Sequence, residues 1–181
     1  MGLASKEENV LELIFNSPKH WHFEELIKES KLSRGRLNHW LKKLLNEKII
    51  KRIKEKGKMP YYVGNFDSPS YKNQKRMYAL NKLYKTGFLN HLQSLSDAKT
   101  VIIFGSFSRS DWYENSDIDL FIYGSAQGLN LSKYELDLER EIQLFECKDK
   151  NNLKKFGEGL IKNIIKGNII KGNLDFCEVK V

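Results

Sequence analysis

Two short polar motifs, each attached to a strand-like segment, constrain the fold of this chain more than any other feature. The first is the pair Gly105 and Ser106, which directly follows a β-branched and aromatic run at residues 100–104. Such a run, when it ends at glycine, predicts a buried strand that enters a tight turn. The second motif is the pair Asp117 and Asp119, which opens another apolar run. We therefore expect two strands of one sheet, with a polar turn after the first and two carboxylates on the second.

The turn after the first strand has the features of a phosphate-binding loop. Residues 107–112 are long enough for about one and a half turns of helix, whose first amide groups carry partial positive charge. The glycine lets the backbone approach a ligand closely, and Ser106 offers a hydroxyl and an amide. Arg109 lies one helical turn further on, where its guanidinium could reach an anionic oxygen. It could equally pair at the surface with a neighbouring carboxylate, Asp111 or Glu114.

The two aspartates are spaced to share a metal ion. In a strand over residues 117–123, side chains alternate between faces, so Asp117 and Asp119 share a face and lie about 6–7 Å apart. Two unpaired carboxylates repel each other at neutral pH, and a bridging divalent cation would relieve that repulsion. Mg²⁺ fits best because it prefers oxygen ligands and completes its shell with phosphate oxygens. Such an ion could orient a triphosphate and stabilise charge on the transferred phosphorus.

Residues 105–109 followed by residues 116–120 resemble the signature of the nucleotidyltransferase superfamily that includes DNA polymerase beta. The resemblance covers residues 99–123 directly and, more loosely, the chain from there to residue 181. It implies a minimal nucleotidyltransferase domain over residues 97–181, of the α/β (α+β) class, with a small mixed sheet flanked by helices. It also implies that Asp117 and Asp119 are the catalytic, metal-binding residues. The nucleotide-binding residues it implies are Gly105, Ser106, Arg109 and Ser116.

The resemblance further implies a third carboxylate on a later strand, and there the chain departs from the pattern. That strand is expected over residues 141–147, and the matching position holds Gln143. An amide cannot carry the negative charge that a second metal ion or a general base would need. Glu141 shares a strand face with Gln143 and could substitute, whereas Glu146 lies on the opposite face unless a bulge shifts the register. A smaller departure is Ser110, where the family usually has glycine.

Positive charge is concentrated in the N-terminal half of the chain. Residues 1–95 hold 19 Lys or Arg and 9 Asp or Glu, a net charge of +10, whereas residues 96–181 hold 12 and 14, a net charge of −2. Within the first half, residues 31–58 carry 11 basic and 2 acidic residues. This density favours a polyanionic partner.

The pattern in this half predicts three helices and then a β-hairpin. Apolar residues recur at helical spacing over residues 7–16, 23–30 and 33–46, and the third segment opens with a serine suited to an N-cap. Two strand-like runs, residues 49–54 and 59–63, flank a turn of lysine and glycine.

This order is similar to that of a winged helix-turn-helix domain over residues 1–66. In that family the third helix enters the major groove of DNA and the hairpin, or wing, lies along the backbone. The resemblance implies double-stranded DNA as a partner, and a protein-interaction role for the same face is the alternative. The side chains that would contact DNA are Arg34, Arg36, Asn38, His39, Lys42 and Lys43 on the helix and Lys51, Lys54, Lys56 and Lys58 on the wing.

The remaining segments have weaker signals. Helical spacing over residues 71–95 predicts a connecting helix within residues 67–96, or equally a helix through which two copies form a homodimer. Another amphipathic helix is expected over residues 151–166. Cys147 and Cys177 lack metal-binding or redox spacing and are expected to be free thiols. With no signal peptide and no apolar run of membrane-spanning length, a cytoplasmic protein without a membrane partner is expected.

Two classes of function remain compatible with these features. One is a Mg²⁺-dependent transferase that moves a nucleoside monophosphate from ATP or another triphosphate to an acceptor. The resemblance extends to minimal nucleotidyltransferase antitoxins, so that the acceptor could be a protein. The other is a DNA-binding transcriptional regulator whose nucleotidyltransferase-like domain only binds a nucleotide. Gln143 favours the regulator, and the intact aspartate pair favours the transferase.

Overall fold

The computed structural model describes residues 6–177, so the outermost residues of the expected domains 1–66 and 97–181 lie outside the described part. The chain divides into two compact units. The first unit holds the described residues up to Lys75 together with Trp112–Glu114, and the second holds Arg76–Asp111 and the described residues from Asn115 onward. The helix α4 (Pro69–Lys85) continues from the first unit into the second, so the chain changes units inside a helix.

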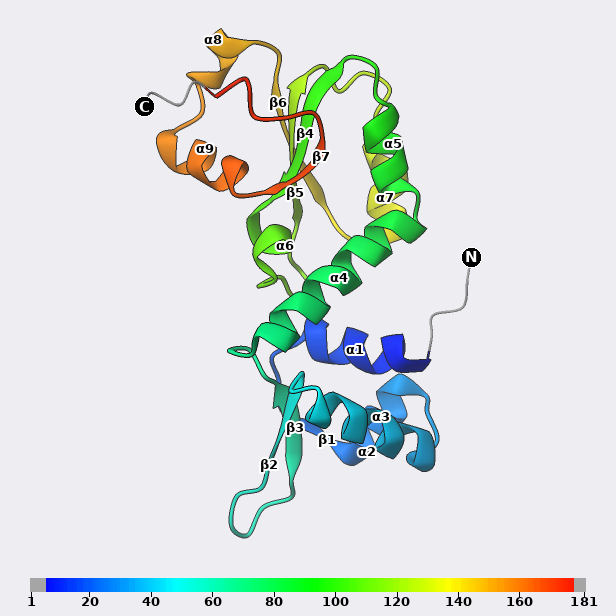
Figure 1. Ribbon diagram of the computed structural model, residues 1–181. Helices are drawn as coiled ribbons and strands as arrows, with labels where there is room; N and C mark the ends of the chain where they lie inside the picture. The colour runs from blue at the N-terminus through cyan, green and yellow to red at the C-terminus, as the bar shows by residue number, and fades with distance from the viewer. Residues whose placement is uncertain (1–5, 178–181) are drawn as a thin grey trace. The chain divides into compact units, whose positions relative to one another are not determined.

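Besides the start of α4, the described part of the first unit contains three helices and a small antiparallel sheet (Figure 1). The sheet has the strand order β1-β3-β2, with β3 paired to both of the others. The helices and the hairpin lie where the sequence pattern predicts them, but the two-residue strand β1 is too short to give any periodic signal. The elements are α1 (Lys6–Asn16), β1 (Trp21–His22), α2 (Phe23–Ser30), α3 (Arg34–Asn46), β2 (Ile50–Ile53) and β3 (Tyr61–Gly64).

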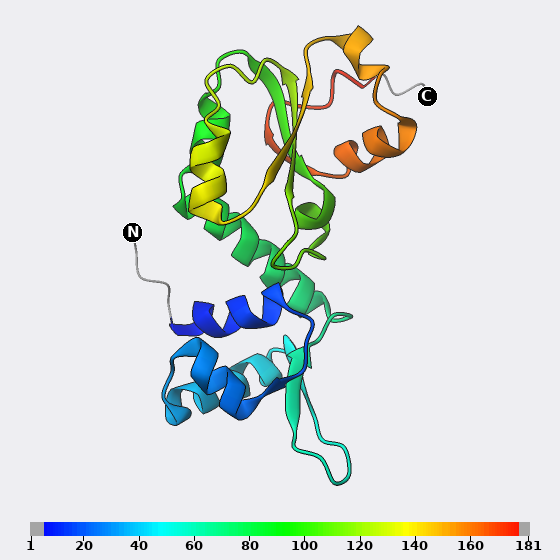
Figure 2. The same ribbon diagram turned by 180° about the vertical axis from the view of Figure 1, so that it is seen from behind.

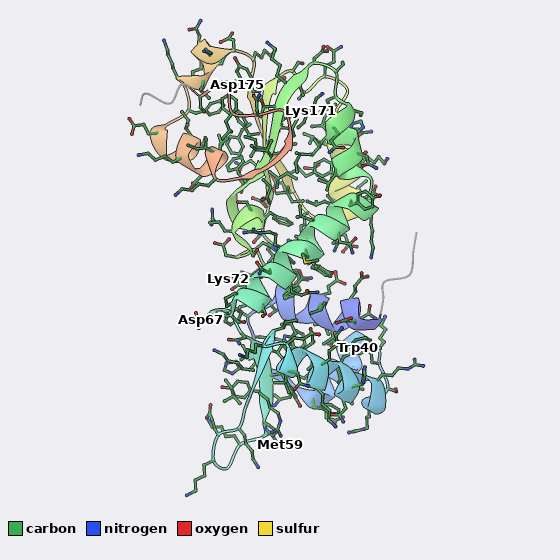
Figure 3. The ribbon with its side chains drawn as sticks, viewed as in Figure 1. Trp40, Met59, Asp67, Lys72, Lys171 and Asp175 are labelled. Atoms are coloured by element: carbon green, nitrogen blue, oxygen red, sulfur yellow. The ribbon has the colours of Figure 1, made fainter. Side chains whose placement is uncertain are left out.

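The third helix packs through one apolar stripe. Leu37, Leu41 and Leu44 are at most 1% exposed, as expected for residues that recur every three or four positions on a helix. Trp40, labelled in Figure 3, and Leu45 lie at the edges of this stripe and are only partly buried. The opposite face of α3 is therefore left to polar and basic side chains.

A lysine is buried among aromatic rings of the first unit. Lys75 is 1% exposed, and its Nζ donates a hydrogen bond to the carbonyl of Phe15 at 2.9 Å. The same Nζ lies 4.5 Å from the ring centre of Tyr113, 4.6 Å from that of Trp112 and 5.6 Å from that of Tyr71. Aromatic faces attract a cation, and the hydrogen bond offsets part of the lost hydration. Two residues that stand between the polar motifs in sequence are thereby fixed in this unit.

The second unit is a four-stranded sheet with helices on both faces (Figures 1 and 2). Its strand order is β6-β5-β4-β7, with β5 and β6 parallel and the other pairs antiparallel. Both views place α5 and α7 on one face and α9 on the other, which confirms the expected mixed sheet flanked by helices. The elements are α5 (Phe88–Ser94), β4 (Ala98–Phe104), α6 (Gly105–Arg109), β5 (Ile118–Gly124), α7 (Leu131–Leu138), β6 (Ile142–Cys147), α8 (Lys150–Leu153), α9 (Glu158–Ile165) and β7 (Asn168–Lys171).

The central strands β4 and β5 are buried on both faces, which explains their continuous apolar sequence. Ile102 and Phe121 belong to a core cluster that includes Ile164 of α9, and all three are at most 1% exposed. Ile103 and Leu120, which face the opposite side of the sheet, are equally buried. Polar groups on these strands are consequently confined to the strand ends.

Two expected helices are each split in the structure. The helix expected over residues 71–95 is α4 and α5, because Gly87 takes a φ of +78° at the N-cap of α5 and interrupts the helical backbone. The helix expected over residues 151–166 is α8 and α9, separated by a turn that ends at Gly157 in an extended conformation. The helix α7 had no sequence expectation.

The structure also bears on the two cysteines and on the expected absence of a membrane-spanning segment. Cys147 and Cys177 are free thiols, and burial raises the pKa of both. In the described part of the chain, no helix has both the length and the apolar character needed to cross a membrane.

Candidate active site

The polar turn follows β4 directly and is held by its own hydrogen bonds. Gly105 begins α6 with a φ of +68°, a conformation that residues with a side chain rarely adopt. The Ser108 hydroxyl, which is buried, donates to the carbonyl of Gly105 at 2.9 Å. The Ser106 carbonyl accepts from the N–H of Ser110, and the Ser106 side chain is partly exposed. The turn is thus held by hydrogen bonds, with the Ser108 side chain buried and the Ser106 side chain partly exposed.

The helix in this turn differs from the one expected over residues 107–112. It is α6, Gly105–Arg109, which starts earlier and ends where Ser110 takes a left-handed φ of +65°. Arg109 closes it, and its Nε donates to Asp111 Oδ2 at 2.9 Å, with both side chains about half exposed. The surface pairing left open by the sequence is therefore present.

The aspartate pair lies beside the turn. Asp119 is in register with Phe104, the last residue of β4. A Cβ built on Gly105 would lie 1.9 Å from Asp119 Oδ2 and 2.8 Å from its Cγ. A side chain at position 105 would force the Asp119 carboxylate to move, so in the wild-type chain the glycine backbone directly faces that carboxylate. The turn and the strand that carries the aspartates therefore converge on one place.

Burial and charge distinguish the two aspartates. Asp117 is exposed and precedes β5 by one residue, whereas Asp119 is partly buried within the strand. Burial is the main reason that the pKa of Asp119 is raised, and the neighbouring Asp117 carboxylate raises it further. The positive charge of Arg109 lowers the same pKa. The carboxylates are close enough to repel each other, and an arginine of the turn acts on one of them.

The position expected for a third carboxylate lies next to the aspartates. Gln143 of β6 is the parallel-strand partner of Asp119, and it is exposed. Glu141 stands just before β6, two residues from Gln143, and is also exposed. Glu146 pairs in register with Ile122, further along the strand, and its carboxylate accepts from the backbone N–H of residue 126 at 2.9 Å. The register of β5 and β6 contains no bulge that would bring Glu146 to the aspartates.

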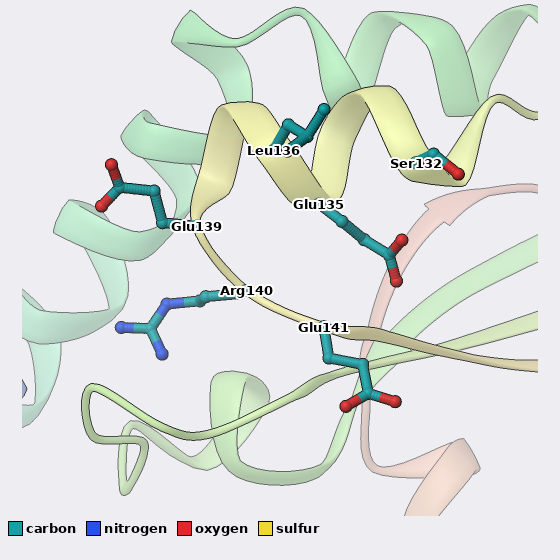
Figure 4. A pocket seen from close by; sticks show the side chains of 6 residues that line it. All are labelled: Ser132, Glu135, Leu136, Glu139, Arg140 and Glu141. Atoms are coloured by element: carbon teal, nitrogen blue, oxygen red, sulfur yellow. The ribbon is translucent and has the colours of Figure 1, made fainter.

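An open groove of about 650 Å³ lies along α7 and the segment that leads into β6 (Figure 4). Three of its lining residues come from α7 and three from the segment that joins α7 to β6 (Figure 4). The lining residues are Ser132, Glu135, Leu136, Glu139, Arg140 and Glu141. The groove is mainly acidic, so the expected substitute carboxylate, Glu141, lies in negatively charged surroundings.

The two aspartates suit a cation that phosphate oxygens also coordinate. Among residues 6–177, no group of three or more His, Cys, Asp or Glu is placed to hold a metal ion. Asp117 and Asp119 alone would leave most of an octahedral shell to phosphate oxygens and water, which is how Mg²⁺ commonly binds in proteins. A cation would also relieve the repulsion that contributes to the raised pKa of Asp119.

Sequence reasoning missed two side chains that support the turn, Ser108 within it and Arg76 from another helix. Arg76 of α4 donates through Nη2 to the carbonyl of Ser108 at 3.4 Å. Ser108 had a visible signal, because it stands two residues after Ser106 within the same motif. Arg76 had none, since it lies 32 residues away in sequence.

The side chains predicted to contact DNA lie on the surface of the first unit. Nine of the ten are exposed, on α3 and on the hairpin whose tip region carries Met59 (Figure 3). The exposed ones are Arg34, Arg36, Asn38, His39 and Lys42 on α3 and Lys51, Lys54, Lys56 and Lys58 on the hairpin.

Some of these cations already have acidic neighbours. Arg34 Nη2 lies 2.8 Å from Glu24 Oε2 in a pair that is mostly exposed. Lys43 is only partly buried but is held by Glu7 at 2.8 Å, and this hydrogen bond raises the pKa of Lys43. Exposed pairs contribute little energy and exchange readily, so Arg34 remains available to a stronger anion, whereas Lys43 is the most constrained of the set.

Comparison with known proteins bears on the second unit. Residues 89–174 match the family model described as "Polymerase beta, Nucleotidyltransferase". The matched segment contains β4, α6, β5 and β6, and with them both polar motifs. The match supports the nucleotidyltransferase part of the resemblance and a general nucleotidyltransferase activity. No match was found among curated proteins or among solved structures.

Proposed function

We propose that this protein is a Mg²⁺-dependent nucleotidyltransferase that moves a nucleoside monophosphate from ATP or another triphosphate to an acceptor. The observation that carries the proposal is the close approach of Gly105 to Asp119, where an added Cβ would lie 1.9 Å from the carboxylate oxygen. A phosphate bound by the turn would then be next to the carboxylates that bind the metal ion. This adjacency is the basic requirement of metal-assisted phosphoryl chemistry.

Each group of the site has a proposed role. Asp117 and Asp119 hold the metal ion, which when bound supplies positive charge that stabilises the transferred phosphorus and its oxygens. The backbone at Gly105 and the partly exposed side chain of Ser106 bind phosphate, because the glycine allows close approach. Arg109 binds a further phosphate oxygen in exchange for Asp111, since their exposed pair is weak. Ser116, the residue before the aspartate pair, completes the nucleotide-binding set.

The third acidic position affects how the acceptor is activated. Gln143 beside Asp119 can donate or accept hydrogen bonds but cannot act as a general base. Glu141 is the carboxylate that could take this role, since it lies two residues before Gln143 at the start of the same strand. A protein side chain is included among the proposed acceptors, as in the antitoxin-type transferases that the sequence resembles.

Label transfer tests this proposal. Purified protein is incubated with α-labelled ATP, Mg²⁺ and cell extract, beside a variant with Asp117→Ala and Asp119→Ala. The proposal predicts label on a macromolecule only with the intact aspartates. If no label is transferred from any of the four nucleoside triphosphates with Mg²⁺ or Mn²⁺, the protein is not a transferase, and the nucleotide-binding regulator favoured by Gln143 replaces it.

A second proposed function is the binding of double-stranded DNA by the first unit as a winged helix-turn-helix domain. What supports it is the arrangement of exposed cations on α3, with Arg36 and Lys42 on its solvent face, and on the β2–β3 hairpin. Such a helix can enter the major groove while the basic hairpin contacts the flanking phosphates.

We further propose a reducing compartment such as the cytoplasm, because both cysteines are free thiols.

A further inference from the structure

We propose that Arg140 is a positioning residue that fixes the polar turn and the aspartate pair relative to each other. Arg140 lies in the segment that joins α7 to β6, far in sequence from both motifs (Figure 4). No sequence motif or family signature used above includes it. The inference rests on the proposed function, because it concerns the geometry of the same site.

Arg140 contacts the two motifs at once. Its Nη1 donates a hydrogen bond to the carbonyl of Ser116 at 3.0 Å, and Ser116 is bonded directly to Asp117. Its guanidinium carbon lies 5.4 Å from the ring centre of Phe107, which directly follows Ser106 in the turn. One planar group thus touches the residue next to the proposed phosphate-binding serine and the residue next to the proposed metal-binding aspartate.

The backbone around Arg140 is itself firmly held. The N–H of Arg140 donates to the carbonyl of Glu135 at 3.1 Å, so the arginine is tied to the end of α7. Glu139 before it takes a left-handed φ of +54°, which turns the chain sharply toward β6. The N–H of Ile142 after it donates to Glu135 Oε1 at 3.1 Å. A side chain that starts from a fixed backbone and is partly buried can hold other groups in place.

Asp117 is the part of the site that needs such support. It is exposed and lies outside β5, so the ladder that fixes Asp119 does not extend to it. A hydrogen bond from a charged guanidinium to the preceding carbonyl restricts rotation of the peptide that leads into Asp117. The cation–π contact with Phe107 holds the guanidinium at the same time, and the compact ammonium of lysine lacks the rigid fork that serves both contacts.

The role predicts a specific defect when Arg140 is changed. Metal-ion binding and phosphate binding reinforce each other only if the aspartates and the turn are correctly spaced. The relevant quantity is therefore the factor by which Mg²⁺ strengthens ATP binding, measured as the ratio of the ATP dissociation constants in EDTA and in Mg²⁺. A side chain with only a structural role would change stability without changing this ratio.

The experiment compares wild type with Arg140→Met, Arg140→Lys and Lys133→Met by isothermal titration with ATP. Lys133→Met is the matched control, because Lys133 makes a cation–π contact with Tyr134 at 5.0 Å and its replacement removes the same charge. We expect Arg140→Met to reduce the Mg²⁺ effect about tenfold, the factor expected for a lost charged hydrogen bond. Arg140→Lys should reduce it about threefold, because a donor is kept but the rigid fork of the guanidinium is lost. Lys133→Met should leave it unchanged.

The outcomes separate this inference from the proposed function. If wild type binds ATP with a Mg²⁺ effect that Arg140→Met retains in full, Arg140 has no positioning role and the inference is wrong while the proposed function stands. If wild type shows no Mg²⁺-dependent ATP binding, the proposed function is wrong, and the inference that depends on it is wrong as well. Should Arg140→Met not fold, Arg140→Lys decides, and a Mg²⁺ effect equal to that of wild type overturns the inference.

Discussion

Replacing Gly105 with alanine perturbs the contact on which the proposed site depends. The new Cβ would lie 1.9 Å from Asp119 Oδ2, so the carboxylate must move. An alanine at φ +68° costs about 1–2 kcal/mol of folding free energy by itself. Forcing the aspartate away from its preferred rotamer adds about 1 kcal/mol. We therefore expect Gly105→Ala to lower the free energy of unfolding by about 2–3 kcal/mol and to reduce Mg²⁺-dependent ATP binding at least tenfold.

Gly128→Ala supplies the control for this prediction. Gly128 has a similar φ of +87°, but an added Cβ there meets no atom within 4 Å. Its replacement should cost only the conformational part, about 1–2 kcal/mol, and leave ATP binding unchanged. Urea unfolding and ATP titration of the two variants separate backbone strain from the clash with Asp119. Equal losses of stability, together with normal ATP binding by Gly105→Ala, would refute the reasoning.

Three further variants test other parts of the structure. Because Asp117 helps to raise the pKa of Asp119, Asp117→Asn should increase the free energy of unfolding at pH 7 by up to about 1 kcal/mol while weakening Mg²⁺-dependent ATP binding. The gain should vanish when urea unfolding is repeated at acidic pH, where the Asp119 carboxyl is protonated and no longer repelled. A loss of stability at pH 7 would contradict the prediction. Lys75→Met removes the buried hydrogen bond to the Phe15 carbonyl together with the cation–π contacts, so urea unfolding should show a loss of about 2–4 kcal/mol. Unchanged stability would contradict this prediction. The double variant Arg36→Ala with Lys42→Ala should bind a DNA duplex more weakly than wild type. The slope of log K against log salt concentration should fall by about 1 for each lost phosphate contact. Wild-type binding that does not depend on salt would exclude the DNA proposal.

The sequence predicted well those elements whose side chains repeat with a regular period. The strand before Gly105 and the third helix of the first unit have uninterrupted apolar patterns, and both lie close to where those patterns predict them. It failed where a single backbone angle decides the outcome. The helix expected over residues 71–95 kept its apolar spacing through Gly87, and only the left-handed φ at that glycine divides it into α4 and α5.

The sequence predicted the local motifs of the candidate site but not the distant side chains that support them. The turn and the aspartate pair are local motifs, so their chemistry can be derived from neighbouring residues. The side chains that support them come from distant parts of the chain, such as Arg76 and Arg140, and their contacts depend on the folded arrangement. The direct approach of Gly105 to Asp119 likewise depends on the register of two strands, which the sequence does not reveal.

The central claim is that the turn and the aspartate pair form one site for metal ion and nucleotide. Amide NMR spectra of labelled protein with ATP and substoichiometric Mn²⁺ test it directly, because the paramagnetic ion broadens resonances of nearby residues. We predict that the signals of Gly105, Ser106, Asp117 and Asp119 broaden together and at the same Mn²⁺ concentration. Broadening confined to one of the two motifs, or located elsewhere in the chain, would contradict the claim.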